Sequence, residues 1–252
     1  MEQVFFILTC LLLGLFSGFI GGLLGIGGGI VIVPVLSLYF DLSGRFDDEL
    51  ALIAAIATSL ACIIFTSSSA AYAQYQKKMV NWEVVRKFLP WLVLGSFSAG
   101  YLIPMLPATV IKTGISLFLA CLAVIMISSW QPPAVRRLPG HVGSSLIGLG
   151  AGLVSGSAGI AGGNVIVPTL VYLNVPPHNA TATSSVLGIP IAVMGTLGYF
   201  ILAPETSDSR LLGYVDIFAF IPIVVGSVIS APIGVKVAHK IKPQRLKKIF
   251  GL

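Results

Sequence analysis

Residues 14–36 read GLFSGFIGGLLGIGGGIVIVPVL, and residues 148–170 read GLGAGLVSGSAGIAGGNVIVPTL. The two stretches agree at 13 of 23 positions when the second is shifted by 134 residues. Each contains a glycine-dense break inside an apolar segment, at residues 25–29 and 159–163, and a proline follows each break. Interrupted hydrophobic segments in corresponding places of two halves point to the binding site of a transporter.

The composition is that of a membrane protein. Hydrophobic residues make up 56% of the 252 residues and charged residues 10%, and the mean hydropathy is +0.98. Such a chain has too little polar surface to cover a soluble globule of this size. Windows without Asp, Glu, Lys or Arg cover residues 3–40, 50–76, 88–111, 113–135, 138–204 and 217–235. Because one span needs about 20 apolar residues, we expect an all-α polytopic protein with roughly eight or nine membrane elements.

Charge predicts how the chain is oriented. Of the 15 Lys and Arg residues, 12 lie in the loops at 76–87, 131–141 and 236–248, and six of the nine acidic residues lie at 41–49 and 205–210. The positive-inside rule places the three basic loops in the cytoplasm, so we expect a multi-pass protein of the plasma (inner) membrane. The net charge of +6 is explained by this asymmetry, and nucleic acid is not an expected partner.

The same reasoning predicts two inverted units, residues 1–135 and 136–252. The first begins outside and ends inside, whereas the second begins inside and places its corresponding loops on opposite sides. Each is expected to hold a Gly-rich broken helical hairpin and about three further helices. The first unit continues after Lys112 with a helix to Trp130, but only four residues follow Lys248. We therefore expect one further helix after Leu252.

Other short motifs also occur twice. Ala57-Thr58-Ser59 corresponds to Ala182-Thr183-Ser184, and each triplet is predicted to head a helix. Val80-Asn81-Trp82 corresponds to Val215-Asp216-Ile217 in the loop that follows. With the duplicated glycine motif, this pattern resembles the TauE/SafE sulfite exporter family of bacterial membrane permeases over nearly the whole chain. The resemblance implies an inverted-repeat permease that moves small sulfur oxyanions or organosulfonates outward across the plasma membrane.

The candidate substrate-binding residues lie at the breaks and at the triplets. They are Gly27, Gly28, Gly29, Thr58, Ser59, Gly162, Gly163, Asn164, Thr183 and Ser184. A run of glycines leaves backbone N–H groups uncovered where the short arms begin, and a helix N-terminus is a positive dipole end that favours an anion. Because inverted hairpins enter from opposite faces, we expect both arms and both triplets to meet around one small cavity near the middle of the membrane.

Structural alternatives to these roles stay open. The break glycines, like Gly14, Gly18, Gly148 and Gly152, allow close helix packing. Asn164 is a candidate for the N-cap of the second arm or for an amide donor to substrate. The hydroxyls of Thr58, Ser59, Thr183, Ser184 and Ser185 are candidates for helix caps, for bonds between helices or for an oxyanion cage. Residues 66–69 are expected to bond between helices, and His178 is expected to be solvated at a loop edge.

The near absence of carboxylates from the predicted spans favours an anionic or neutral substrate. The predicted spans contain no carboxylate except Asp216 near an outer end, whereas cation permeases and proton relays usually keep one buried. An inside-negative potential contributes about 2.3 kcal/mol per 100 mV to each negative charge that leaves the cell. Small anions and the lipid bilayer are therefore the expected partners, and the oligomeric state is not indicated.

Enzymatic chemistry is not predicted. An intramembrane enzyme needs a buried Asp pair, a Ser with a His base or an HExxH zinc site, and none is found in the sequence. Cys10, Cys62 and Cys121 show no metal-ligand spacing and are expected to be buried packing residues, so neither a metal nor a cofactor is expected. The alternatives are a channel-like conductor, an importer of another small solute, and a non-transporting subunit of a membrane complex.

Overall fold

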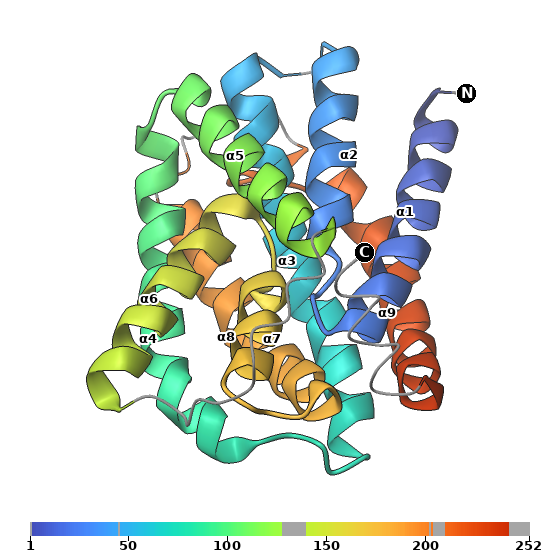
Figure 1. The fold of residues 1–252 in the computed structure, drawn as a ribbon. Coiled ribbons are helices and arrows are strands. Elements are labelled where there is room, and N and C mark those ends of the chain that lie inside the picture. The colour runs from blue at the N-terminus through green and yellow to red at the C-terminus, as the bar shows by residue number, and fades with distance from the viewer. Residues whose placement is uncertain (1, 45, 128–139, 202, 204–209, 242–252) are drawn as a thin grey trace.

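The computed structural model describes residues 2–44, 46–127, 140–201, 203 and 210–241 (Figure 1). In these ranges the helices are α1 (Glu2–Leu24), α2 (Gly29–Leu42), α3 (Asp48–Tyr75), α4 (Trp82–Leu102), the 3-10 turn η1 (Ile103–Met105), α5 (Ala108–Ile127), α6 (His141–Ala158), α7 (Gly163–Tyr172), α8 (Pro177–Ile201) and α9 (Ile217–Lys240). A short antiparallel hairpin, β1 (Leu211–Leu212) and β2 (Val215–Asp216), precedes α9. The sequence did not predict this hairpin.

The all-α polytopic membrane fold is confirmed. Within the described part of the chain, α1, α3, α4 with η1, α8 and α9 are long and apolar enough to cross a membrane. In contrast, α2 with 14 residues and α7 with 10 residues are only about 21 and 15 Å long at 1.5 Å per residue. They are therefore the short arms expected after the two breaks.

The helix α3 is the central helix of the protein. Its membrane window is 83% buried, compared with 39% for α1 and α9. It crosses α8, and each of these two helices also carries one short arm, α2 on α3 and α7 on α8. On the outer helices large apolar side chains remain exposed, such as Phe5 on α1 and Ile229 on α9. Faces of this kind suit contact with lipid rather than with water.

Glycines allow the outer helices to pack at backbone distance, as predicted for residues 14, 18, 148 and 152. A methyl group added at Gly14 would overlap the carbonyl oxygen of Ile223 on α9, and one added at Gly152 would overlap that of Leu92 on α4. α1 therefore lies along α9, and α6 lies along α4. Small residues at membrane helix interfaces have this effect because they let the backbones approach.

Corresponding helices run in opposite directions. In Figure 1, α1, α3 and α9 descend, whereas α6, α8 and α4 rise. They also exchange partners, because α1 of the first half lies against α9 of the second and α6 of the second lies against α4 of the first. The two inverted units themselves remain a prediction, with which this exchange agrees.

Some sequence predictions need correction or lie outside the described residues. The triplets do not head their helices, because α3 begins at Asp48 and α8 at Pro177. The helix-favouring, alanine-rich stretch 50–57 continues directly into Thr58. Most of the basic segments 131–141 and 236–248, Trp130 and the chain end are outside the described residues, as is the side chain of Cys121. Cys10 and Cys62 are buried and form no disulfide within the described ranges, which agrees with their predicted packing role.

Candidate functional site

The two breaks share one backbone conformation. Gly25 and Gly159 have φ values of 71° and 68°, and Gly28 and Gly162 have 82° and 74°, a left-handed region in which glycine lacks the steric cost of other residues. Gly25 donates its N–H to the carbonyl of Gly21, and Gly159 donates to that of Ser155. Each preceding helix thus ends in the same turn.

Each short arm begins with a glycine cap. Gly28 is the N-cap of α2 and Gly162 is the N-cap of α7, and neither offers a side-chain oxygen to the helix. Asn164 is therefore not the N-cap of α7, which removes one of its two predicted roles. Its side-chain nitrogen is buried and has no hydrogen-bond partner among the described residues. The amide is thus an available donor.

Backbone N–H groups at both breaks have no acceptor in the part of the chain that the structure describes. The first four N–H groups of a helix have no partner within that helix. Within the described ranges, no hydrogen bond is donated by the N–H groups of Gly27, Gly28, Gly29, Ile30, Ala161, Gly162, Gly163 and Asn164. Most of these residues are buried. Such donors at a helix N-terminus, together with the positive end of the helix dipole, are what an anion needs.

The structure brings the two breaks into direct contact. A methyl group added at Gly29 would overlap the carbonyl oxygen of Gly159, and one added at Gly163 would overlap the carbonyl oxygen of Gly25. A Cβ at Gly27 would overlap that of Ala161, its counterpart in the second copy. The two arms therefore begin in contact with each other, and in this conformation the backbones meet at close range. The small substrate cavity expected between them stays a prediction.

The Ser of each triplet holds the break of the other half. Ser59 Oγ donates to the carbonyl oxygen of Gly159 at 2.8 Å, and Ser184 Oγ donates to that of Gly25 at 3.0 Å. Both side chains are fully buried. These hydroxyl hydrogens are engaged with the protein, which favours their predicted interhelical role over the predicted oxyanion cage.

The Thr of each triplet holds the start of a helix in the other half. The N–H of Asp216 donates to Thr58 Oγ1 at 2.9 Å, and the N–H of Asn81 donates to Thr183 Oγ1, also at 2.9 Å. Asn81 in turn caps α4, and Asp216 caps α9 through Oδ1 and the N–H of Ala219. The same arrangement thus occurs twice: a Thr in the middle of one half's central helix accepts the N–H of the residue that caps a helix of the other half.

Residues 66–69 divide into two groups. Thr66 donates to Ser227 Oγ at 2.8 Å and Ser69 donates to the carbonyl of Val228 at 2.9 Å, as predicted for interhelical bonds. Ser68 is exposed and bonds back to Ile64 in its own helix. Ser67 is buried, and its hydroxyl has no partner among the described residues. The sequence did not single it out.

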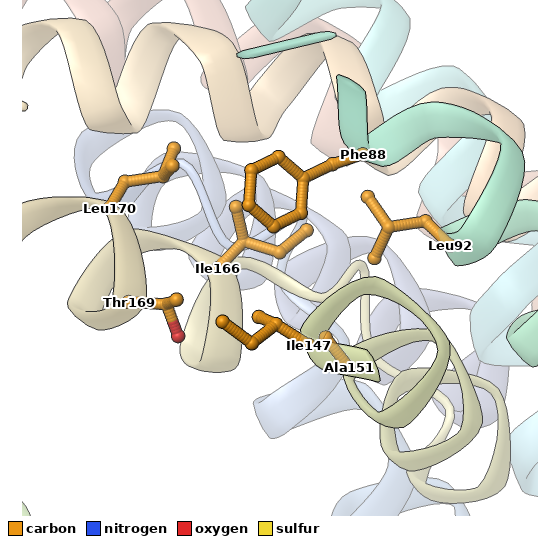
Figure 2. Close-up of a pocket in the computed structure, with 7 residues that line it drawn as sticks. All are labelled: Phe88, Leu92, Ile147, Ala151, Ile166, Thr169 and Leu170. Carbon is orange, nitrogen blue, oxygen red and sulfur yellow. The ribbon is translucent and has the colours of Figure 1, made fainter. Parts of the chain in front are cut away.

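A small hollow lies between α4, α6 and α7 (Figure 2). Its lining consists of Phe88, Leu92, Ile147, Ala151, Ile166, Thr169 and Leu170. The one hydroxyl of this lining, on Thr169, bonds to Val165 in its own helix. The hollow therefore offers no free polar group to an anion, and it is not the small cavity predicted around the breaks.

A second polar cluster joins the ends of three helices. The rings of His178 and His239 stack with centroids 5.5 Å apart, and His239 Nε2 lies 2.8 Å from Oε1 of Gln74. His178 is partly buried rather than solvated at a loop edge. Nothing in the sequence indicated this cluster, because the two histidines are 61 residues apart and meet only because α8 and α9 both pack against α3.

Several spanning helices and two broken segments that meet inside them define a multi-pass membrane transporter. The model of the family described as Sulfite exporter TauE/SafE matches residues 10–252, and the chain belongs to this family. It is 32% identical to a probable membrane transporter protein of Haemophilus influenzae, over 98% of this chain and 94% of the relative. Similar proteins of Methanocaldococcus jannaschii (98% and 92% covered) and Bacillus subtilis (98% and 94%) are 28% and 26% identical. No solved structure matches the chain.

Proposed function

We propose that this transporter exports a small anion, sulfite or a related sulfur oxyanion or organosulfonate, and that the anion binds between the two glycine breaks. The observation that carries the proposal is the contact of two helix N-termini at which eight backbone N–H groups donate no hydrogen bond to any residue that the structure describes. Two positive dipole ends and neutral donors stabilise an anion without a fixed buried cation. Binding of this kind stays weak enough for release.

The two halves act as inverted units that rock against each other around the site. The units are residues 1–135 and 136–252. The exchanged bonds of Ser59 and Ser184 support this arrangement, because each ties the central helix of one half to the break of the other. The close approach of Gly29 to the Gly159 carbonyl and of Gly163 to the Gly25 carbonyl corresponds to a closed conformation, and movement of one unit opens the breaks to the anion.

Export follows from charge and location. The basic loops at 76–87, 131–141 and 236–248 face the cytoplasm of a cell whose plasma membrane holds the protein. The inside-negative potential then drives an anion outward by about 2.3 kcal/mol per charge and 100 mV. The family description names sulfite export. The protein carries out this transport without chemical conversion of the solute.

The experiment is a flux assay in proteoliposomes with a panel of sulfite, sulfate, taurine and chloride. We expect saturable sulfite flux above that of protein-free liposomes, which increases when an imposed potential favours anion exit. Protein-dependent flux of a cation or a neutral solute, with none of the sulfur compounds transported, would contradict the proposal. Non-saturating conduction of the anion would indicate a channel instead.

A further inference from the structure

We propose that Ser67 in α3 contacts the transported anion and donates its hydroxyl hydrogen to one of its oxygens. The inference rests on the proposed function and adds a residue to its site. The two halves then contribute different donors to the site: the first half supplies the Ser67 hydroxyl and the second half supplies the Asn164 amide.

The first observation is an unpaired buried hydroxyl. Ser67 is 1% exposed, and its Oγ has no hydrogen-bond partner among the described residues. Serine and threonine in a helix commonly bond to a carbonyl one turn earlier, as Ser68 does to Ile64 and Ser185 does to Thr181. A buried hydroxyl without a partner is costly. A bound ligand that accepts a hydrogen bond from Ser67 would explain why this hydroxyl is buried without a protein partner.

The second observation is where the hydroxyl lies. Ser67 Oγ is 3.1 Å from the position that a Cβ on Gly27 would occupy and 2.9 Å from that of a Cβ on Gly188. Ala161 contacts the same two positions. The hydroxyl therefore faces the point where the two breaks meet, and the side chains of Ala161 and Ile63 border the same point.

The third observation is that the second half has no counterpart. When the triplets at 57–59 and 182–184 are aligned, Ser67 corresponds to Ala192, which has no hydroxyl. Conversely, Asn164 stands where the first copy has Ile30. Each half thus supplies one neutral side-chain donor near its break, and both donors are without a partner among the described residues. Two donors of this kind favour a solute whose oxygens only accept hydrogen bonds.

The four triplet hydroxyls are less suited to this role. Ser59 and Ser184 already donate to carbonyls, and Thr58 and Thr183 accept backbone N–H groups. To donate to an anion, Ser59 and Ser184 have to give up these bonds, and Thr58 and Thr183 lie against the starts of α9 and α4, whereas Ser67 has no bond to give up. Among the hydroxyls beside the breaks, Ser67 is therefore the donor that can bind substrate at least structural cost.

The test compares Ser67→Ala with Ser68→Ala, since Ser68 is the exposed neighbour in the same helical turn. Sulfite flux into proteoliposomes is measured over a range of concentrations. We expect the apparent KM to rise about fivefold to 100-fold in Ser67→Ala, as loss of a buried hydrogen bond to a charged group predicts, and to stay unchanged in Ser68→Ala. An unchanged KM in Ser67→Ala while the unmutated protein transports sulfite would overturn the role of Ser67 and leave the proposed function intact.

Thermal unfolding separates substrate contact from a structural role. Without anion, Ser67→Ala should unfold at the same temperature as the unmutated protein or higher, because an unpaired buried hydroxyl is removed. The increase in unfolding temperature that sulfite produces should become smaller. A lower unfolding temperature without anion, with the sulfite effect retained, would show a structural residue. Absence of flux of every anion by the unmutated protein would overturn the proposed function and this inference together.

Discussion

Ser59 donates a hydrogen bond of 2.8 Å to the carbonyl oxygen of Gly159, 100 residues away in the other half of the chain. The corresponding bond runs from Ser184 to Gly25 at 3.0 Å. Both acceptors are left-handed glycines at which a helix has just ended. Two equivalent hydrogen bonds thus connect the halves. Through them, a serine on α3 holds the second glycine break and a serine on α8 holds the first.

The Ser59→Ala and Ser184→Ala variants should each lower the stability of the protein by about 1–3 kcal/mol, because a buried carbonyl loses its donor. The two losses should be similar if the bonds are equivalent. Thermal unfolding in detergent measures them, with Ser145→Ala as the control, because the partly exposed Ser145 bonds only within its own helix. Unchanged stability together with lost sulfite binding would mean that these hydroxyls are ligands rather than structural ties.

The cap of α9 should tolerate an amide. Asp216 Oδ1 accepts the N–H of Ala219 at 2.9 Å, and Asn81 has the same position before α4. Asp216→Asn should therefore keep the unfolding temperature close to that of the unmutated protein, and Asp216→Ala should cost about 0.5–2 kcal/mol. Equal losses in both variants would show that the charge, and not the cap, is required.

The glycines at the break contact should not accept a side chain. Gly29→Ala and Gly163→Ala place a methyl group onto the carbonyls of Gly159 and Gly25, so we expect strongly reduced folding yield or lost transport. Gly150→Ala in α6 is the matched control, because a Cβ there meets nothing within 4 Å. This control should be as stable or up to about 1 kcal/mol more stable. Normal flux in Gly29→Ala would show that the breaks are not packed against each other.

The sequence predicted the convergence of the breaks because a glycine run and its repeat are local features. It did not predict where the helices begin, since Thr58 lies in the middle of α3 and the alanine-rich stretch before it extends the helix. It also did not distinguish Ser67 from Ser68. Neighbouring residues in a helix differ by about 100° in direction, and only the packing of α3 decides which one is buried.

The orientation of the chain is tested by labelling cysteines from outside the cell. Cys10, Cys62 and Cys121 are first replaced by Ala, and Ser43→Cys or Lys77→Cys is added, both at exposed positions at opposite ends of α3. A membrane-impermeant maleimide should label Ser43→Cys in intact cells and Lys77→Cys only after permeabilisation, as the positive-inside rule predicts. The reverse pattern would invert the orientation and, with it, the argument for export.

The central claim, a single anion site between the two glycine breaks, is tested most directly by diffraction from crystals that contain selenite. Selenite has the shape and charge of sulfite and an atom with an anomalous signal. We predict one anomalous peak between Gly27 and Ala161, with a selenite oxygen about 3 Å from Ser67 Oγ. Peaks confined to other places, such as the hollow beside Phe88, or no peak at a concentration that saturates flux, would contradict the account.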